Sequence, residues 1–146
     1  MSYQVIVVGT DGSPRAAVAV DEALELARLT GATVHAVHAI HTPPVIDDPQ
    51  AVQAMMDGMR DHSDAIQAEL LEHAKRMNVT VEFHGSLGDP ANALVELAER
   101  VNADLVVVGN RGMGGMKRFV LGSVPNKVSH HCPCSVLIVD TEPKHD

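Results

Sequence analysis

Five short apolar runs, rich in β-branched residues, alternate along this chain with segments of helical periodicity. The runs cover residues 5–8, 33–39, 79–83, 104–108 and 135–139. The first, fourth and fifth are almost continuously apolar, which is typical of strands covered on both faces of a parallel sheet. The second and third are more polar, and we expect them to be outer strands. The alternation predicts an α/β fold: a doubly wound, five-stranded parallel sheet with helices on both faces.

Start and stop signals delimit the helices between these runs. Ser13 followed by proline, and Asp89 followed by proline, are typical of an N-cap and a first helical residue, and Gly31 is typical of a helix C-cap. We expect helices over residues 14–29, 49–77 and 123–131, and another that begins at residue 90. Ser123 is the expected N-cap of the last helix. The helically spaced methionines Met55, Met56 and Met59 are predicted to be flexible core filler.

The bulk composition limits the size and the partners of the protein. A chain of 146 residues without a repeat or a linker predicts one domain, 1–146. Eleven basic and nineteen acidic residues give a net charge of −8, which disfavours nucleic acid and anionic membranes as partners. No apolar stretch reaches the roughly 18 residues of a membrane span, and the first residues lack a signal-peptide pattern. We therefore expect no nucleic-acid or membrane partner and a cytoplasmic location.

Two loops at the carboxyl ends of predicted strands carry the signals for a ligand site. Doubly wound sheets bind ligands at these ends, where the direction of the connections reverses. One loop begins Gly9-Thr-Asp, and the other contains Gly109 and Gly112 and, after nine further residues, Gly122 and Ser123. Glycines let a backbone approach a ligand closely, and a helix N-terminus offers free N–H groups to an anion. The two loops together predict a phosphate cradle and hence a nucleotide site.

Other residues near these loops have two interpretations each. Asp11 is a candidate ligand residue, but an aspartate there also commonly stabilises a turn. Arg111, Lys117 and Arg118 could neutralise phosphate charge, although exposed surface charge is an equally good reading of Lys117 and Arg118. The P-loop motif is absent, and the glycines after residue 112 fail the dinucleotide pattern at its last position.

The histidines and cysteines do not predict a metal site. His35 and His38 alternate along a strand and therefore point to opposite faces, so with His41 they cannot close one site. Cys132 and Cys134 form a C-x-C pair without a second ligand pair, and reduced thiols are the expected state. The neighbouring His130 and His131 are a slightly better metal candidate at a helix end. For none of these four residues does the sequence fix a role, and no metal ligand is predicted.

The loop spacing resembles a known family motif. The pattern G-x2-G-x9-G-[ST], met by Gly109, Gly112, Gly122 and Ser123, is similar to that of the ATP-binding branch of the universal stress protein (UspA) family. The similarity runs from the first strand to the last and covers nearly the whole chain. It implies a Rossmann-like fold of the adenine nucleotide alpha hydrolase type, with ATP, and possible Mg²⁺, as cofactor.

The resemblance assigns roles to individual positions. Asp11 is expected beside the ribose and phosphates, Ala39 at the adenine edge, and Ser123 at the phosphates. Pro125 stands where a hydroxyl residue is often found, which puts one phosphate contact in doubt. The residues placed at the nucleotide are Gly9, Thr10, Asp11, Ala39, Val108, Gly109, Arg111, Gly112, Gly122, Ser123, Val124 and Pro125.

Three functions are open at this stage. The first is an ATP-binding stress-response protein that regulates a partner protein as a homodimer; in the family, dimers commonly pair through the last strand, here Val136, Leu137, Ile138 and Val139. The second is an enzyme such as a slow ATPase, which lacks a convincing general base because Asp11 is the only acid near the crevice. The third is a module that binds cyclic AMP or no nucleotide, and the glycine motif argues against the nucleotide-free module. A binding protein rather than an enzyme is the expected class.

Overall fold

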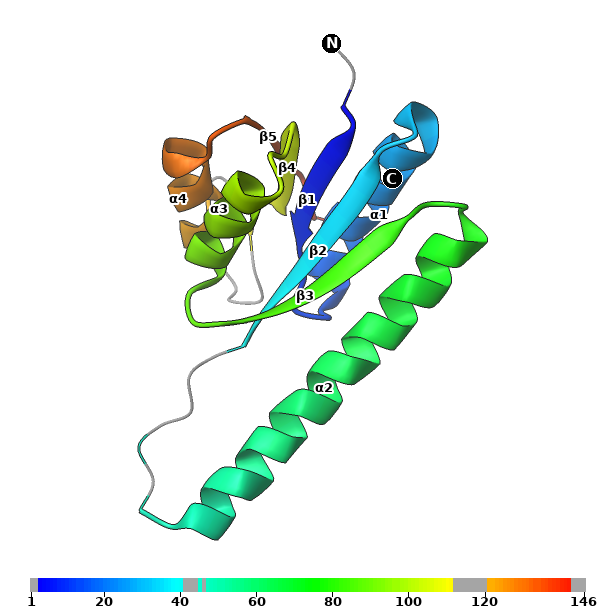
Figure 1. Cartoon of the computed structure of the whole chain (residues 1–146). Helices are drawn as coiled ribbons and strands as arrows, with labels where there is room; N and C mark the ends of the chain where they lie inside the picture. Colours follow the sequence, from blue (N-terminus) through cyan, green and yellow to red (C-terminus); the bar gives the residue numbers. More distant parts are fainter. Residues whose placement is uncertain (1–2, 41–44, 46, 112–120, 143–146) are drawn as a thin grey trace.

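The computed structural model describes residues 3–40, 45, 47–111 and 121–142 of the chain. Strands and helices alternate strictly along it (Figure 1). The elements are β1 (Val5–Gly9), α1 (Pro14–Thr30), β2 (Thr33–Ile40), α2 (Pro49–Arg76), β3 (Val81–Leu87), α3 (Pro90–Arg100), β4 (Leu105–Gly109), α4 (Ser123–His131) and β5 (Ser135–Val139). The described residues thus contain the five strands that the sequence predicts.

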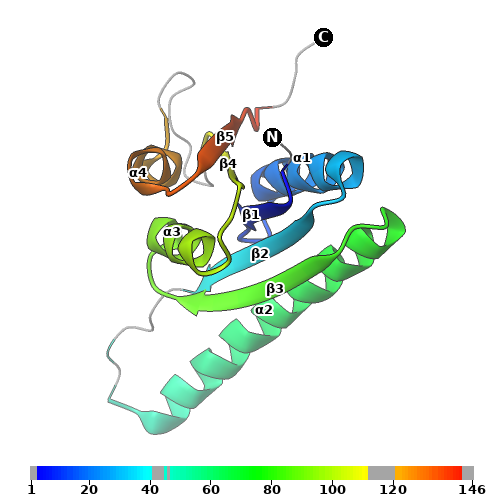
Figure 2. The same ribbon diagram turned by 45° about the horizontal axis from the view of Figure 1, so that its top comes forward.

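All strand pairs are parallel, and the sheet order is β3-β2-β1-β4-β5. Helices α1 and α2 cover one face of the sheet, and α3 and α4 cover the other (Figure 2). The chain winds outward from β1 to β3 and then crosses to β4 on the other side of β1. The predicted doubly wound α/β fold is therefore confirmed, with its reversal of direction between β1 and β4.

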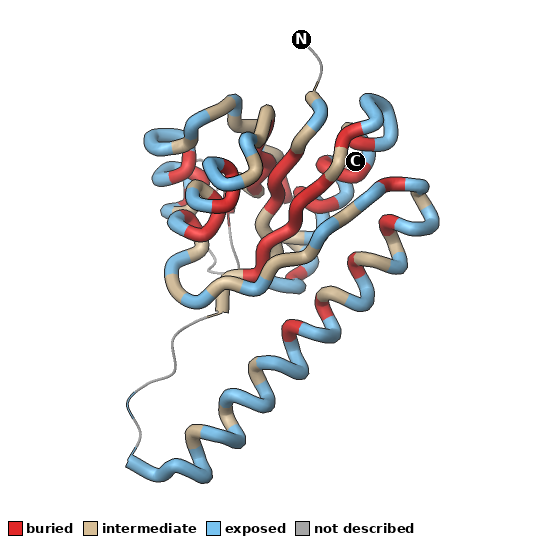
Figure 3. Tube along the Cα trace, viewed as in Figure 1, coloured by how far each residue is buried: buried red, intermediate tan, exposed pale blue. Residues whose placement is uncertain are grey.

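The central strands are buried because helices cover both of their faces (Figure 3). Ile6 and Val8 pack with α1 in one hydrophobic cluster, whereas Val7 packs with α3 in the other. Alternate residues of one strand thus fill two separate cores, which explains the nearly continuous apolar runs of β1 and β4. Of the two more polar runs, β3 is an outer strand, but β2 is an inner one that pairs with both β1 and β3.

The third strand begins later than its apolar residues suggest. It starts at Val81 and continues to Leu87, instead of covering residues 79–83. Val79 is buried at the end of α2, where its N–H donates to the carbonyl of Ala74 at 3.0 Å. As an outer strand, β3 tolerates polar residues, which is why its second half gives no apolar signal.

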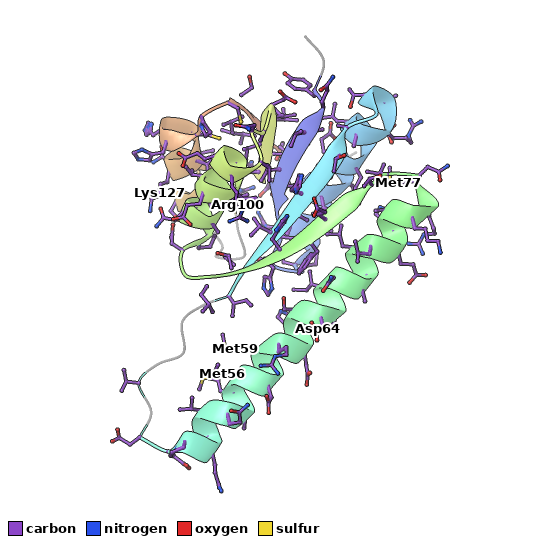
Figure 4. All side chains as sticks on the ribbon, viewed as in Figure 1. Met56, Met59, Asp64, Met77, Arg100 and Lys127 are labelled. Carbon is purple, nitrogen blue, oxygen red and sulfur yellow. The ribbon has the colours of Figure 1, made fainter. Side chains whose placement is uncertain are left out.

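Helix α2 extends well beyond the sheet that its C-terminal half covers (Figure 4). Its buried residues are Ser63, Ile66, Leu70 and Ala74, all in the second half. Met56 is 45% exposed, and Met55 and Met59 are only partly buried, so their prediction as core filler is wrong. Despite the 28 residues of α2, no helix in the described part of the chain is both long and apolar enough to cross a bilayer.

Side-chain caps fix three of the four helix starts. Ser13 accepts a hydrogen bond from the N–H of Ala16, and Asp89 accepts one from that of Asn92. Asp48 caps α2 in the same way. Gly31 ends α1 in the left-handed conformation, as predicted. Helix α4 differs, because Gly122 is its N-cap and Ser123 its first helical residue, which corrects the predicted N-cap.

The Asp89 cap should contribute to stability in a pH-dependent way. The backbone hydrogen bond from Asn92, and less strongly the Lys127 ammonium, hold the pKa of Asp89 below its usual value against the opposite effect of partial burial. Asp89→Ala should lower the free energy of unfolding by about 1 kcal/mol near neutral pH. Because the folded-state pKa is the lower one, this contribution is complete above the unfolded-state pKa and is lost as the pH falls through the folded-state pKa.

Urea unfolding of the two proteins near neutral pH and in acid measures this difference. Asp64→Ala, which removes an exposed carboxylate from the middle of α2 (Figure 4), is the matched control and should show little loss. A loss for Asp89→Ala that is equally large below the pKa of the carboxylate would contradict the capping account.

Candidate functional site

The loops after β1 and β4 meet at a cavity of about 350 Å³. The cavity lies at the carboxyl ends of these strands, where the winding direction reverses. Eleven of the twelve residues predicted for the site line it; the twelfth, Gly112, falls outside the described residues, as do His41, Lys117 and Arg118. Seven further lining residues were not predicted: Ser13, Arg15, Ala16, Ala19, Val37, Pro90 and Leu94. The N-terminal turns of α1, α3 and α4 thus all reach the cavity.

The loop after β1 is held by one hydrogen bond to β2 and by others within the loop itself. The N–H of Thr10 donates to the carbonyl of Val37 on β2, and the N–H of Gly12 donates to the Thr10 hydroxyl. Gly12 has a φ of +79° and a side chain there would meet Ile66 of α2, so glycine is required. The N–H of Ser13 donates to Asp11 Oδ1 at 2.8 Å. Asp11 therefore does stabilise a turn, while a carboxylate can accept further bonds through its second oxygen.

Asn110 organises the loop after β4, and sequence reasoning did not select it. Its N–H donates to the carbonyl of Val139, and its carbonyl accepts from the N–H of Gly122. Its side-chain oxygen accepts from both the N–H and the hydroxyl of Thr141, at 3.0 and 2.9 Å. One asparagine thus joins the end of β4, the start of α4 and the segment after β5. The sequence signal that could have identified Asn110 is its position between Gly109 and Gly112 of the glycine motif.

The two described glycines of the motif permit close contacts within the protein. A Cβ atom at Gly109 would lie 2.8 Å from Thr141 Cγ2, and one at Gly122 would lie 3.3 Å from the Asn110 carbonyl oxygen. Since the N–H of Gly122 already donates to Asn110, the free backbone donors of α4 come from its first helical positions, Ser123 and Val124. Pro125 has no N–H to offer.

The charges at the cavity are partly compensated inside the protein. Arg111 is 5% exposed and forms an ion pair with Glu142, which also lies 3.8 Å from Arg15. A phosphate group that enters here would compete with Glu142 for both guanidinium groups. Asp11 is the one carboxylate among the described residues that line the cavity.

A second cavity of about 410 Å³ lies between α1 and α2. It is slightly larger, but neither the β4 loop nor the start of α4 lines it. Its walls are mainly side chains of the two helices, including His62, Glu69 and Arg76. We regard the cavity between β1 and β4 as the candidate site because backbone donors and helix N-termini converge there.

Three polar residues cluster away from the cavity, at the edge of the sheet. His35 of β2 lies 3.1 Å from His84 and 3.4 Å from Glu82, both on β3. Burial, then the charges of His35 and Arg100, lower the pKa of His84, and Glu82 acts in the opposite direction. The next histidine, His38, packs on the other sheet face with Ser63 of α2, so the predicted alternation is confirmed. Sequence reasoning missed this cluster because it depends on the pairing of β2 with β3.

The C-x-C cysteines are unbridged, with their sulfur atoms 3.7 Å apart. Burial and the neighbouring Cys132 raise the pKa of the Cys134 thiol to about 12. His130 and His131 lie exposed in the last turn of α4. Neither histidine joins a group of three close metal-ligating side chains among the residues that the structure describes.

The chain belongs to the universal stress protein family, whose pattern it matches over residues 2–140. It is 37% identical over 146 residues to universal stress protein Rv1636 of Mycobacterium tuberculosis, covering 96% of this chain and 98% of that one. It is also similar to a universal stress protein solved in complex with cAMP, at 37% identity and a TM-score of 0.76, covering 97% of this chain and all of that one. A universal stress protein of Archaeoglobus fulgidus, solved with dAMP, is 25% identical with a TM-score of 0.66, covering 96% and 100%.

The close contact at Gly109 gives a direct test of how the cradle is packed. Gly109→Ala should lower the free energy of unfolding by about 1–3 kcal/mol, because its Cβ meets Thr141 Cγ2. Thr141→Ser removes that methyl group and keeps the hydroxyl that bonds Asn110. In the double variant most of the loss should be recovered, as measured by denaturant unfolding in a double-mutant cycle. Strictly additive effects would show that the two positions do not pack as described.

Proposed function

We propose that this protein binds ATP in the cavity between the β1 and β4 loops. The observation that carries the proposal is the convergence there of two glycine loops and the first turn of α4, whose leading N–H groups have no partners within the helix. The related proteins solved with cAMP and with dAMP support an adenine nucleotide as the ligand class. A cavity of about 350 Å³ falls in the usual range for small-molecule sites.

The lining divides into an apolar and a polar part, as a nucleotide requires. Val37 and Ala39 of β2 and Val108 of β4 lie toward the carboxyl ends of the two strands that flank β1, and they offer an apolar wall to the adenine and ribose. Ser123 and Val124 offer backbone donors to the phosphates. The Arg111 guanidinium contributes positive charge when a phosphate replaces Glu142 as its ion-pair partner. In this proposal Asp11, an exposed residue of the cavity lining, contacts the ribose or a phosphate-bound Mg²⁺. Gly112 is a further expected phosphate contact outside the described residues.

Cyclic AMP is the second candidate ligand, because a protein 37% identical to this chain was solved with it. ATP and cyclic AMP share adenine, ribose and phosphate, so the apolar wall would serve both. They differ in the charge and the length of the phosphate group. The two basic side chains and the α4 N-terminus favour the longer, more highly charged triphosphate.

We further propose that the protein acts as a binding module and not as an efficient enzyme. Phosphoryl transfer needs a positioned nucleophile and groups that neutralise charge in the transition state. Asp11 is the one carboxylate on the described part of the cavity lining, and it already accepts a bond from Ser13. In this proposal the nucleotide regulates contact with a cytoplasmic partner protein during stress.

The proposed module is a homodimer that pairs through β5. This strand is an edge of the sheet, and its side chains from Val136 to Val139 are only partly buried, with Ile138 37% exposed. An exposed apolar edge strand invites pairing with a second chain. Asn110 connects this edge to the cavity, since its N–H donates to the carbonyl of Val139.

Filling the apolar wall should prevent nucleotide binding. Ala39→Leu adds three carbons to a half-buried position at the cavity and is expected to weaken ATP binding about tenfold or more. Ala68→Leu, which adds the same atoms to an exposed position on α2, is the control. Calorimetric titration with ATP and with cyclic AMP, each with and without Mg²⁺, measures both affinities.

The same titrations separate the proposal from its alternatives. Unchanged ATP affinity in Ala39→Leu would contradict this placement of the ligand, and equal or tighter binding of cyclic AMP would overturn the preference for ATP. Chromatography of the ATP recovered after long incubation should show it intact. Repeated turnover would contradict the assignment as a binding module.

A charge on the β5 edge should separate the dimer. Ile138→Lys places an ammonium in the proposed apolar contact, and sedimentation should then show a monomer. Val45→Lys, at an equally apolar but 99% exposed position away from β5, should leave the dimer unchanged. A dimer that persists in Ile138→Lys would show that another surface pairs the chains.

A further inference from the structure

Two histidines and a glutamate meet at the β2–β3 edge of the sheet. In the parallel register His35 pairs with Glu82, and His84 lies two residues further along β3, so the three side chains share one face. His35 Nδ1 lies 3.1 Å from His84 Nε2 and 3.4 Å from Glu82 Oε2. All three donor atoms lie within 4.8 Å of one another, the one such group among the described residues.

The two separations from His35 Nδ1 are close to those between neighbouring ligand atoms of a zinc ion. Zinc–nitrogen and zinc–oxygen bonds of about 2.0–2.2 Å in a tetrahedron place neighbouring ligand atoms about 3.3–3.6 Å apart. A set of two imidazoles and one carboxylate is among the combinations that hold zinc with its fourth position open to water. Mg²⁺, by contrast, prefers oxygen ligands in an octahedron.

We propose that His35, Glu82 and His84 form a binding site for a divalent transition metal ion of the Zn²⁺ type. Both imidazoles would direct a lone pair at the ion, from His35 Nδ1 and His84 Nε2. Without an ion one of these nitrogens carries the proton of the N···N contact. On binding, that proton moves to the other nitrogen of the same ring, so two neutral rings bind the ion with no net release of protons.

The burial of the three residues suits a bound ion with access from solvent. His35 is 8% exposed and is held on an inner strand, whereas the Glu82 side chain is 64% exposed on the edge strand. The buried imidazole supplies a fixed ligand, and the exposed carboxylate leaves an entry path and room for water. The positive charge of Arg100 on α3 opposes the binding of a cation here, just as it lowers the pKa of His84. The Glu82 carboxylate offsets that repulsion.

The metal site is separate from the nucleotide cavity. His35 precedes Ala39 by four residues on β2, which is about 13 Å along an extended strand. Neither His35, Glu82 nor His84 lines the cavity. An ion here would join β2 to β3, and its main effect would be to stabilise that edge of the sheet.

Titration of the purified full chain with Zn²⁺, in the absence of nucleotide, tests the proposal. We expect one equivalent to bind and to raise the melting temperature. His84→Gln and Glu82→Gln each remove one ligand and should weaken binding about tenfold or more. The control is the double variant His130→Gln with His131→Gln, which removes two exposed histidines and should bind as the unmodified chain does.

Substitution with Co²⁺ provides a second measurement, since tetrahedral Co²⁺ gives intense visible absorption bands. The unmodified chain should show these bands and His84→Gln should lose them. Unchanged Zn²⁺ affinity in His84→Gln, or loss of binding in the His130 and His131 control, would overturn the proposal. Because no nucleotide is present, neither result bears on ATP binding.

Discussion

The parallel pairing of β1 with β4 is the constraint on which the rest of the molecule depends. Val7 pairs with Val106 and Val8 with Val107 at the centre of the sheet. From this pair the chain leaves β1 toward α1 on one face and leaves β4 toward α4 on the other. The two loops must therefore separate, and the space between them is the cavity. Leu94 of α3, directly against Gly9, forms its floor.

A second feature is the way in which the chain after β5 returns to the cavity. Asn110 holds Thr141 through two hydrogen bonds, and Glu142 pairs with Arg111. The edge strand proposed for dimerisation and the loop proposed for phosphate binding are thus joined by one short network. A ligand that displaced Glu142 from Arg111 would act on the segment that follows the dimer edge. If the protein pairs through β5 as proposed, this network connects the nucleotide cavity to the dimer contact.

The sequence was sufficient for the fold class and for most of the cavity, but not for the position of every strand. The second run was expected at the outside and is the inner strand β2, whereas the fifth was expected to be covered on both faces and is the partly buried edge strand β5. Apolar runs, proline after a capping residue and a glycine at the end of α1 are local signals, and a glycine motif with fixed spacing locates the loop after β4. Features that depend on tertiary pairing were not predictable in this way. The start of β3 depends on its pairing with β2, since Val79 is as apolar as Val81. Met56 has helical spacing, but its exposure depends on how far α2 extends beyond the sheet.

The polar contacts likewise depend on tertiary pairing and were not predictable from local sequence signals. Asn110 lies inside the recognised motif, yet its function as an anchor requires Val139 and Thr141, about thirty residues away. The cluster of His35, Glu82 and His84 likewise requires a register between two strands. Glu82 and His84 share a strand face by their spacing alone, but nothing in the sequence pairs them with His35 and not with His38.

A crystal structure of the protein soaked in millimolar ATP and Mg²⁺ tests the central claim most directly. We expect the adenine against Val37, Ala39 and Val108, and the phosphates within hydrogen-bonding distance of the N–H groups of Ser123 and Val124. Density for the nucleotide in the cavity between α1 and α2, or a β1–β4 cavity filled by protein atoms, would contradict the account.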